Sequence, residues 1–148
     1  MARQKTAKLQ RSEVVTVRFD PRLRYLVELA ARKQRRTVSS FLEWAAEQAI
    51  NEVTIGTKVF EDEPGFPRTE DVSAGDWADL LWDVDRPDRL AKLGQHFPEL
   101  LTYDEQIIWK RIQEDAEVWH GGAQLDFPLM RSRWARYVEG VSRAAEEE

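Results

Sequence analysis

One short segment constrains this chain more than any other feature, because it is predicted to be a β-strand with nothing to pair with. Residues 13–19 alternate in character and are rich in β-branched side chains, which favours an extended strand with two faces. A lone strand leaves its backbone donors and acceptors unpaired along both edges. Since no other segment of the first 50 residues is predicted to pair with it, we expect a second copy of the chain to supply an antiparallel partner. One face carries Val15, Val17 and Phe19, and the other carries Val14, Thr16 and Arg18.

Two helices are predicted directly after this strand. Asp20 and Pro21 combine an N-cap residue with a proline at the first helical position. Apolar residues recur at helical spacing until the period breaks at 34–36, and Thr37 is a suitable N-cap for a second helix that runs to Val53. The apolar strand face would pack on these helices in the dimer. The residues expected in the dimer core are Val15, Val17, Phe19, Leu23, Val27, Phe41, Leu42 and Ala45.

Charge is distributed unevenly along the chain. Residues 1–50 hold 11 Lys/Arg and 5 Asp/Glu, and residues 51–148 hold 11 Lys/Arg and 22 Asp/Glu, so charges of +6 and -11 give the net -5. Such a split indicates that the first part binds a polyanion and that the second part has another role.

A two-stranded ribbon of this kind fits the major groove of B-DNA. Arg18 can make a bidentate contact with guanine, Thr16 can hydrogen-bond a base, and Val14 can touch a thymine methyl. The N-terminus of the second helix offers free amides and a positive dipole end, which suit a phosphate. Base contacts flanked by phosphate contacts are what sequence-specific DNA binding requires. The residues expected to bind phosphate are Arg35, Arg36, Thr37, Val38 and Ser39.

The first third of the chain resembles the ribbon-helix-helix (MetJ/Arc-type) family of DNA-binding domains. The resemblance covers roughly residues 12–53 and implies an obligate intertwined dimer that reads its operator with the β-ribbon. It also implies that Val14, Thr16 and Arg18 read bases and that the turn over 37–39 anchors a phosphate. The chain departs from the family at Arg35, where glycine is common, so this turn either carries a small left-handed strain or takes another geometry. The motifs are Val15-Thr16-Val17-Arg18-Phe19-Asp20-Pro21-x-Leu23 and Thr37-x-Ser39-x-Phe41-Leu42-x-x-Ala45.

The expected fold class is mainly α, with an N-terminal ribbon-helix-helix, an intermolecular two-stranded antiparallel sheet and a C-terminal all-α region. Capping boxes begin two of the expected C-terminal helices, Ser73 with Asp76 and Thr102 with Glu105. The expected C-terminal helices cover 73–83, 87–96, 102–119 and 128–145. The expected regions are a flexible basic arm at 1–11, the ribbon-helix-helix domain at 12–53, a linker at 54–72 around the acidic, turn-rich stretch 61–67, and an acidic helical domain at 73–145.

Most of the tryptophans lie in the acidic part of the chain. Their helical spacing with aliphatic residues is typical of a small helical core. The alternative is an exposed aromatic surface that docks a basic partner protein. Trp44 differs, because it lies on the second helix where the family usually has a polar residue, and it either anchors the C-terminal half or lies exposed. The candidates for partner binding are Trp77, Trp82, Trp109 and Trp119.

No constellation of residues indicates an enzyme, a cofactor or a metal. The chain has no cysteine, and its two histidines, His96 and His120, stand far apart. Asp83, Asp85 and Asp88 form a small acidic group that helix capping explains better than metal binding. No apolar stretch is long enough for a membrane span and residues 1–10 lack the core of a signal peptide, so we expect a soluble cytoplasmic protein without membrane contact.

These features predict a sequence-specific DNA-binding transcriptional repressor that acts as a homodimer, with two dimers side by side on repeated half-sites as in many family members. One alternative is an antitoxin-type protein whose acidic, tryptophan-rich half neutralises a partner. Another is a plasmid partition or transfer protein with the same DNA-binding domain. The operator sequence and any effector are not encoded in a recognisable pattern.

Overall fold

The computed structural model describes residues 13–61 and 64–141. The chain forms two compact units, residues 1–45 and 46–148. Its secondary structure is mainly α, as the sequence predicts. Within the described ranges, no helix combines the length and the apolar character needed to cross a bilayer. The expected basic arm at 1–11 lies outside the described residues.

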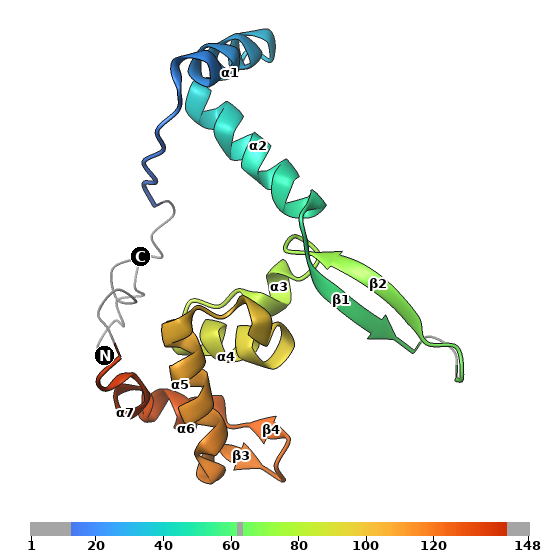
Figure 1. Ribbon diagram of the computed structural model, residues 1–148, viewed down its shortest axis with the longest axis vertical. Coiled ribbons are helices and arrows are strands. Elements are labelled where there is room, and N and C mark those ends of the chain that lie inside the picture. The colour runs from blue at the N-terminus through green and yellow to red at the C-terminus, as the bar shows by residue number, and fades with distance from the viewer. Residues whose placement is uncertain (1–12, 62–63, 142–148) are drawn as a thin grey trace, which may run out of the picture. The chain divides into compact units, whose positions relative to one another are not determined.

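The first unit contains an extended segment followed by a helix and the start of a second helix (Figure 1). Residues 13–20 lie in neither a helix nor a strand of this single chain. Helix α1 spans Pro21–Lys33 and begins where the sequence predicts. Helix α2 spans Val38–Glu52, so it begins in the first unit and continues into the second.

The segment 54–72 was expected to be a linker, and the structure corrects this expectation. Strand β1 (Thr54–Phe60) pairs antiparallel with β2 (Arg68–Ser73), so most of this segment belongs to a β-hairpin (Figure 1). Strand β1 ends at Phe60 and β2 begins at Arg68, and between them Gly65 has a φ of 89° that suits glycine. The second strand is hard to detect from sequence because its first four residues are all polar or charged. These four are exposed, and only Val72 and Ser73 are buried.

Lys58 fastens this hairpin to the helical part of the second unit. Its ammonium group donates a hydrogen bond to the His96 carbonyl oxygen at 2.7 Å and lies 4.4 Å from the ring centre of Phe97. It also lies 5.3 Å from the ring centre of Trp77. A cation above aromatic faces is stabilised by the π-electrons, so the hairpin is held by polar and aromatic contacts together.

Five α-helices follow the hairpin among the described residues, together with two short 3-10 turns. The capping box at Thr102 is confirmed, because Thr102 and Glu105 exchange hydrogen bonds between their side chains and backbone amides. The helices are α3 (Ala78–Leu81), α4 (Arg86–His96), α5 (Tyr103–Glu114), α6 (Phe127–Ser132) and α7 (Trp134–Val138), and the 3-10 turns are η1 (Pro98–Leu100) and η2 (Ala116–Val118).

Three of the expected C-terminal helices are shorter than predicted. Ser73 and Asp76 do form their hydrogen bonds, but Ser73 ends β2, so the bonds close a turn and α3 begins only at Ala78. Helix α5 ends at Glu114, because the Asp115 side chain accepts a hydrogen bond from the Glu117 amide and starts a 3-10 turn. The expected helix 128–145 is two short helices separated at Arg133, and residues beyond 141 lie outside the described part.

The C-terminal region was expected to be all-α, and the structure corrects this expectation as well. Strands β3 (Trp119–His120) and β4 (Gln124–Leu125) form a second small hairpin. Gly121 and Gly122 lie in its turn with φ values of 60° and 77°, which glycine adopts without strain, so the pair permits this reversal.

Helices α4 and α5 contribute half of the buried core of the second unit, and α6, α7, η2 and β4 contribute one residue each. Ile112, Val118 and Met130 have no exposed surface. Gly94 lets α4 approach α5 closely, since a Cβ atom at this position would stand 2.5 Å from the Trp109 ring. The buried cluster consists of Leu90, Ala91, Leu101, Ile108, Trp109, Ile112, Val118, Leu125, Met130 and Tyr137.

Candidate nucleic-acid interface

The extended segment 13–19 has no backbone partner among the residues that the structure describes. No backbone hydrogen bond joins it to any residue within 13–61 or 64–141. Its side chains are open to solvent, with Val14 97%, Val15 80% and Val17 59% exposed. Thr16 and Arg18 are exposed as well, and Phe19 is half-buried. The candidate base-reading residues and the apolar residues of the other face therefore both remain available to another molecule.

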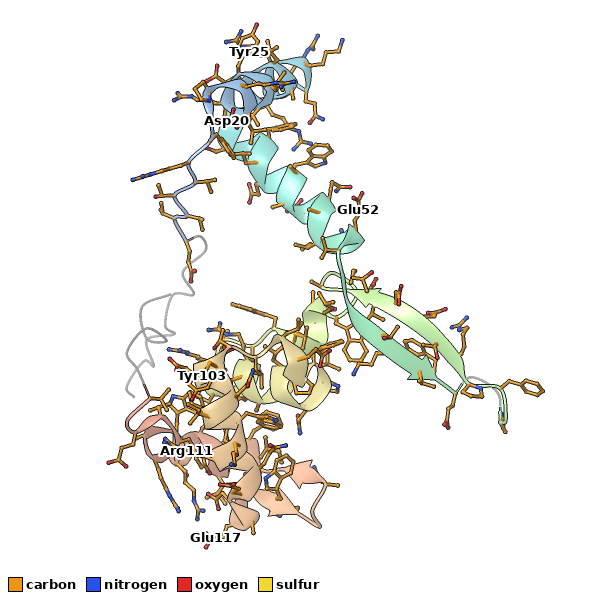
Figure 2. All side chains as sticks on the ribbon, viewed as in Figure 1. Asp20, Tyr25, Glu52, Tyr103, Arg111 and Glu117 are labelled. Atoms are coloured by element: carbon orange, nitrogen blue, oxygen red, sulfur yellow. The ribbon has the colours of Figure 1, made fainter. Side chains whose placement is uncertain are left out.

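Asp20 fixes the point where this segment meets α1 (Figure 2). One carboxylate oxygen of Asp20 accepts hydrogen bonds from the Arg22 amide at 2.9 Å and the Leu23 amide at 3.0 Å. Pro21 occupies the first helical turn, where its missing amide hydrogen is not needed. The N-cap and proline predicted from sequence thus end the extended segment and begin the helix.

The turn between α1 and α2 takes the left-handed conformation at Arg35, which is one of the two geometries that the sequence left open. The φ of Arg35 is 54°, the single positive value at a non-glycine residue in the described chain. The Arg36 amide donates to the Ala31 carbonyl at 2.9 Å and the Arg35 amide to the Arg32 carbonyl at 3.0 Å. This pair of bonds is a Schellman motif, in which a left-handed residue closes a helix. Arg35 occupies the position that glycine normally takes, and it bears the strain.

The start of α2 leaves backbone amides available. The Thr37 hydroxyl accepts a hydrogen bond from the Ser40 amide at 3.1 Å, so Thr37 is the N-cap that the sequence predicts. The amides of Val38 and Ser39 donate to no acceptor among the described residues. Val38 and Ser39 are exposed, as are Arg35 and Arg36. Residues 35–39 therefore bring together two free amides, the positive end of a helix and two arginines.

Arg36 is held by an aromatic contact that the sequence did not reveal. Its guanidinium carbon lies 5.5 Å from the ring centre of Trp44. Phe41 contacts the same ring, with the two ring centres 5.6 Å apart and tilted by 43°. The unusual tryptophan on the second helix therefore packs against its own helix and the preceding turn. Spacing alone gave no signal for this contact, because Arg36 precedes the helix.

The candidate dimer-core residues are poorly covered in the single chain. Ala31, 2% exposed, is the one buried side chain described in the first unit. The exposed members of the expected core are Val15, Val17 and Leu23, and the half-buried members are Phe19, Val27, Phe41, Leu42 and Ala45.

The four candidate partner-binding tryptophans separate into different environments. Trp109 is 6% exposed and belongs to the core, where its ring meets that of Trp119 edge-on at 6.1 Å. The indole nitrogen of Trp119 donates to the Ile112 carbonyl at 2.9 Å. Trp77 is half-buried beside Phe97, whereas Trp82 is 63% exposed. Of the four, Trp82 alone presents most of its surface to solvent.

The acidic group of Asp83, Asp85 and Asp88 comes together in space, with one oxygen of each within 4.8 Å of the others. Cations of the chain itself neutralise two of the three carboxylates, because Lys92 contacts Asp83 at 2.8 Å and Arg131 contacts Asp88 at 2.6 Å. Burial raises the pKa of Asp88, although Arg131 acts in the opposite direction. The group therefore joins α4 to its surroundings electrostatically.

A partly buried polar network in the second unit was not predicted from sequence. Asp115 accepts hydrogen bonds from the Arg133 guanidinium at 2.9 Å and from the Tyr137 hydroxyl at 2.6 Å. Burial raises the pKa of Asp115, but these hydrogen bonds outweigh it and hold the pKa below its ordinary value. Arg133 also contacts Glu117. The network ties the end of α5 to α7 and has no free reacting group at its centre.

Searches of protein-family models, curated proteins and solved structures found no significant match to this chain. The candidate interface therefore stands on its own geometry.

Proposed function

We propose that this protein is a sequence-specific DNA-binding transcriptional repressor that acts as a homodimer. Residues 12–53 would form a ribbon-helix-helix domain, with the 13–19 segments of two protomers paired as a β-ribbon in the major groove. The main support is segment 13–19, whose backbone has no partner in the described chain and whose apolar face is exposed. A second copy would satisfy both the backbone groups and the apolar face at once.

The distribution of polar groups supports DNA as the ligand of the resulting ribbon. Thr16 and Arg18 alternate with Val15 and Val17, so pairing that buries the valines leaves the polar side chains outward. Arg18 forms no ion pair with a described residue. The free amides at the start of α2 supply phosphate contacts that would fix the ribbon in its register.

Selection of bound duplexes from a random DNA pool tests this function. Full-length protein should enrich one sequence, and Arg18→Ala should weaken binding to that sequence by about 1–3 kcal/mol while relaxing one base position. Arg24→Ala is the matched control, because it removes the same charge from an arginine that pairs with Glu28 on α1. Failure to enrich any sequence, or equal binding by Arg18→Ala and the parent, would contradict the proposal.

One observation favours a second function, in which the acidic half binds a basic partner as an antitoxin does. Trp82 is largely exposed, and large exposed aromatic residues are enriched at interface hot spots. The built-in core of the second unit argues against a tail that folds only on binding. Limited proteolysis of the full chain distinguishes an autonomous domain from a partner-folded tail. Resistance of the region after residue 68 supports the domain, and rapid cleavage supports the tail.

A further inference from the structure

We propose that Trp44 is a positioning residue that holds the Arg36 guanidinium ready for a DNA phosphate, with Phe41 bracing the tryptophan ring. This inference rests on the proposed DNA-binding function and adds a residue to the same interface. It assigns a role to an aromatic residue that neither the helix periodicity nor the dimer core requires.

The arginines of the first unit differ in how they are held. Arg24 and Arg32 both lie within ion-pair distance of Glu28, at 3.2 Å and 4.0 Å, so the one carboxylate offsets part of their charge. Arg36 instead lies over the Trp44 ring and forms no hydrogen bond or ion pair through its side chain with the described residues. It is therefore both oriented and electrostatically uncommitted.

An aromatic contact suits this purpose better than a carboxylate does. The π-electrons of an aromatic ring attract a guanidinium through the face of the guanidinium group. The five N–H donors of that group lie in its plane instead. The donors consequently remain available for phosphate oxygens, and the positive charge is not cancelled. A carboxylate partner would occupy the donors and oppose the approach of a second anion.

The local packing explains how the ring is kept in place. Side chains on a helix point back towards its N-terminus, so Trp44 extends towards the first turn of α2. Phe41 contacts the ring there at 5.6 Å, and both aromatic residues are half-buried. Restricting a long arginine before binding reduces the entropy that is lost when it contacts DNA. This raises the affinity roughly two- to tenfold for each side chain.

Binding of full-length protein to a fluorescein-labelled duplex of random sequence tests this role, because phosphate contacts do not depend on sequence. Titrations between roughly 50 and 200 mM salt should give a shallower slope for Arg36→Ala, by about 0.9 for each lost phosphate contact. Trp44→Leu, which keeps an apolar side chain without a π-face, should weaken binding about four- to hundredfold for the two anchors of a dimer. Trp44→Phe should retain binding within about twofold of the parent, since an aromatic face remains.

The double variant Arg36→Ala/Trp44→Leu separates positioning from a structural effect. If Trp44 acts through Arg36, the double variant binds no more weakly than Arg36→Ala, whereas a structural role adds a second loss. Additive losses, or a Trp44→Leu protein that binds as tightly as the parent, would overturn the inference while leaving DNA binding intact. Absence of binding by the parent protein would overturn both this role and the proposed function.

Discussion

The two units of this chain solve the problem of burying apolar surface differently. In the described part of the first unit, Ala31 is the one side chain that is buried, and several valines and leucines remain open. The second unit buries a cluster that runs from Leu90 to Tyr137, drawn from helices and from a small hairpin. A unit with its own core can be stable alone, whereas a unit with an open apolar face depends on association for stability.

The polar contacts show the same difference. Those of the first unit are local, such as the Asp20 cap and the pairing of Arg24 with Glu28. The second unit also has local caps, but it adds contacts between distant parts of the sequence, as when Arg133 and Tyr137 meet Asp115. Local contacts define where helices begin, but long-range contacts fix how elements pack. The first unit therefore has well-defined secondary structure but few long-range contacts among its described residues.

The largest effect is expected from Val17→Asp, which places a charge on the apolar face of the extended segment. In the proposed dimer two unpaired carboxylates would be buried, at several kcal/mol each. We expect dimerisation to be lost in sedimentation experiments while the second unit keeps its core. Val14→Asp is the control, because the opposite face should keep the dimer and lose DNA binding. A Val17→Asp protein that remains dimeric would contradict the view that the first unit depends on association whereas the second has its own core.

A large effect confined to the second unit is expected from Ile112→Ala. Ile112 is fully buried, so the substitution should lower the free energy of unfolding by about 2–5 kcal/mol through lost contacts and a cavity. Tyr103→Ala, at a position that is 76% exposed, should change it by no more than about 0.5 kcal/mol. Denaturant unfolding monitored by tryptophan fluorescence measures both. If Ile112→Ala also disrupts dimerisation, the two units are not energetically separate.

A moderate, pH-dependent effect is expected from Asp115→Asn. The folded-state pKa of Asp115 is lowered, so its contribution is present above the ordinary value of 3.8 and is lost as pH falls through the folded-state pKa. At neutral pH the substitution should destabilise the second unit by about 1–3 kcal/mol, because charged hydrogen bonds to Tyr137 and Arg133 are weakened. Thermal unfolding measured from pH 7 to below 3.8 should show the parent and the variant converging. A difference that stays constant with pH would contradict this account.

The smallest effect is expected from Arg35→Gly in the first unit. Glycine adopts the left-handed conformation without strain, so the substitution should stabilise the first unit by up to about 1 kcal/mol. Arg36→Gly should not stabilise it, since no positive φ is found at that position. Because the first unit is expected to fold as a dimer, thermal unfolding is compared at equal protein concentration. Destabilisation by Arg35→Gly would show that the arginine side chain outweighs the backbone strain.

The sequence by itself determined where the main helices begin and where backbone strain could arise. Asp20, Thr37 and Thr102 each accept the amide hydrogen bonds predicted for an N-cap, and Arg35 has the left-handed backbone that was one of the two geometries expected for its turn. These features depend on side chains within a few residues of the backbone groups that they satisfy, so a local pattern is enough to predict them.

Tertiary structure alone decided where segments end and which aromatic residues are buried. The pairing of β1 with β2 and the burial of Trp109 but not Trp82 both arise from contacts between residues that are not neighbours in sequence. Helical spacing cannot distinguish a tryptophan that faces a core from one that faces solvent. Only the elements packed against each side chain make that distinction, because burial depends on the surface covered by the rest of the fold.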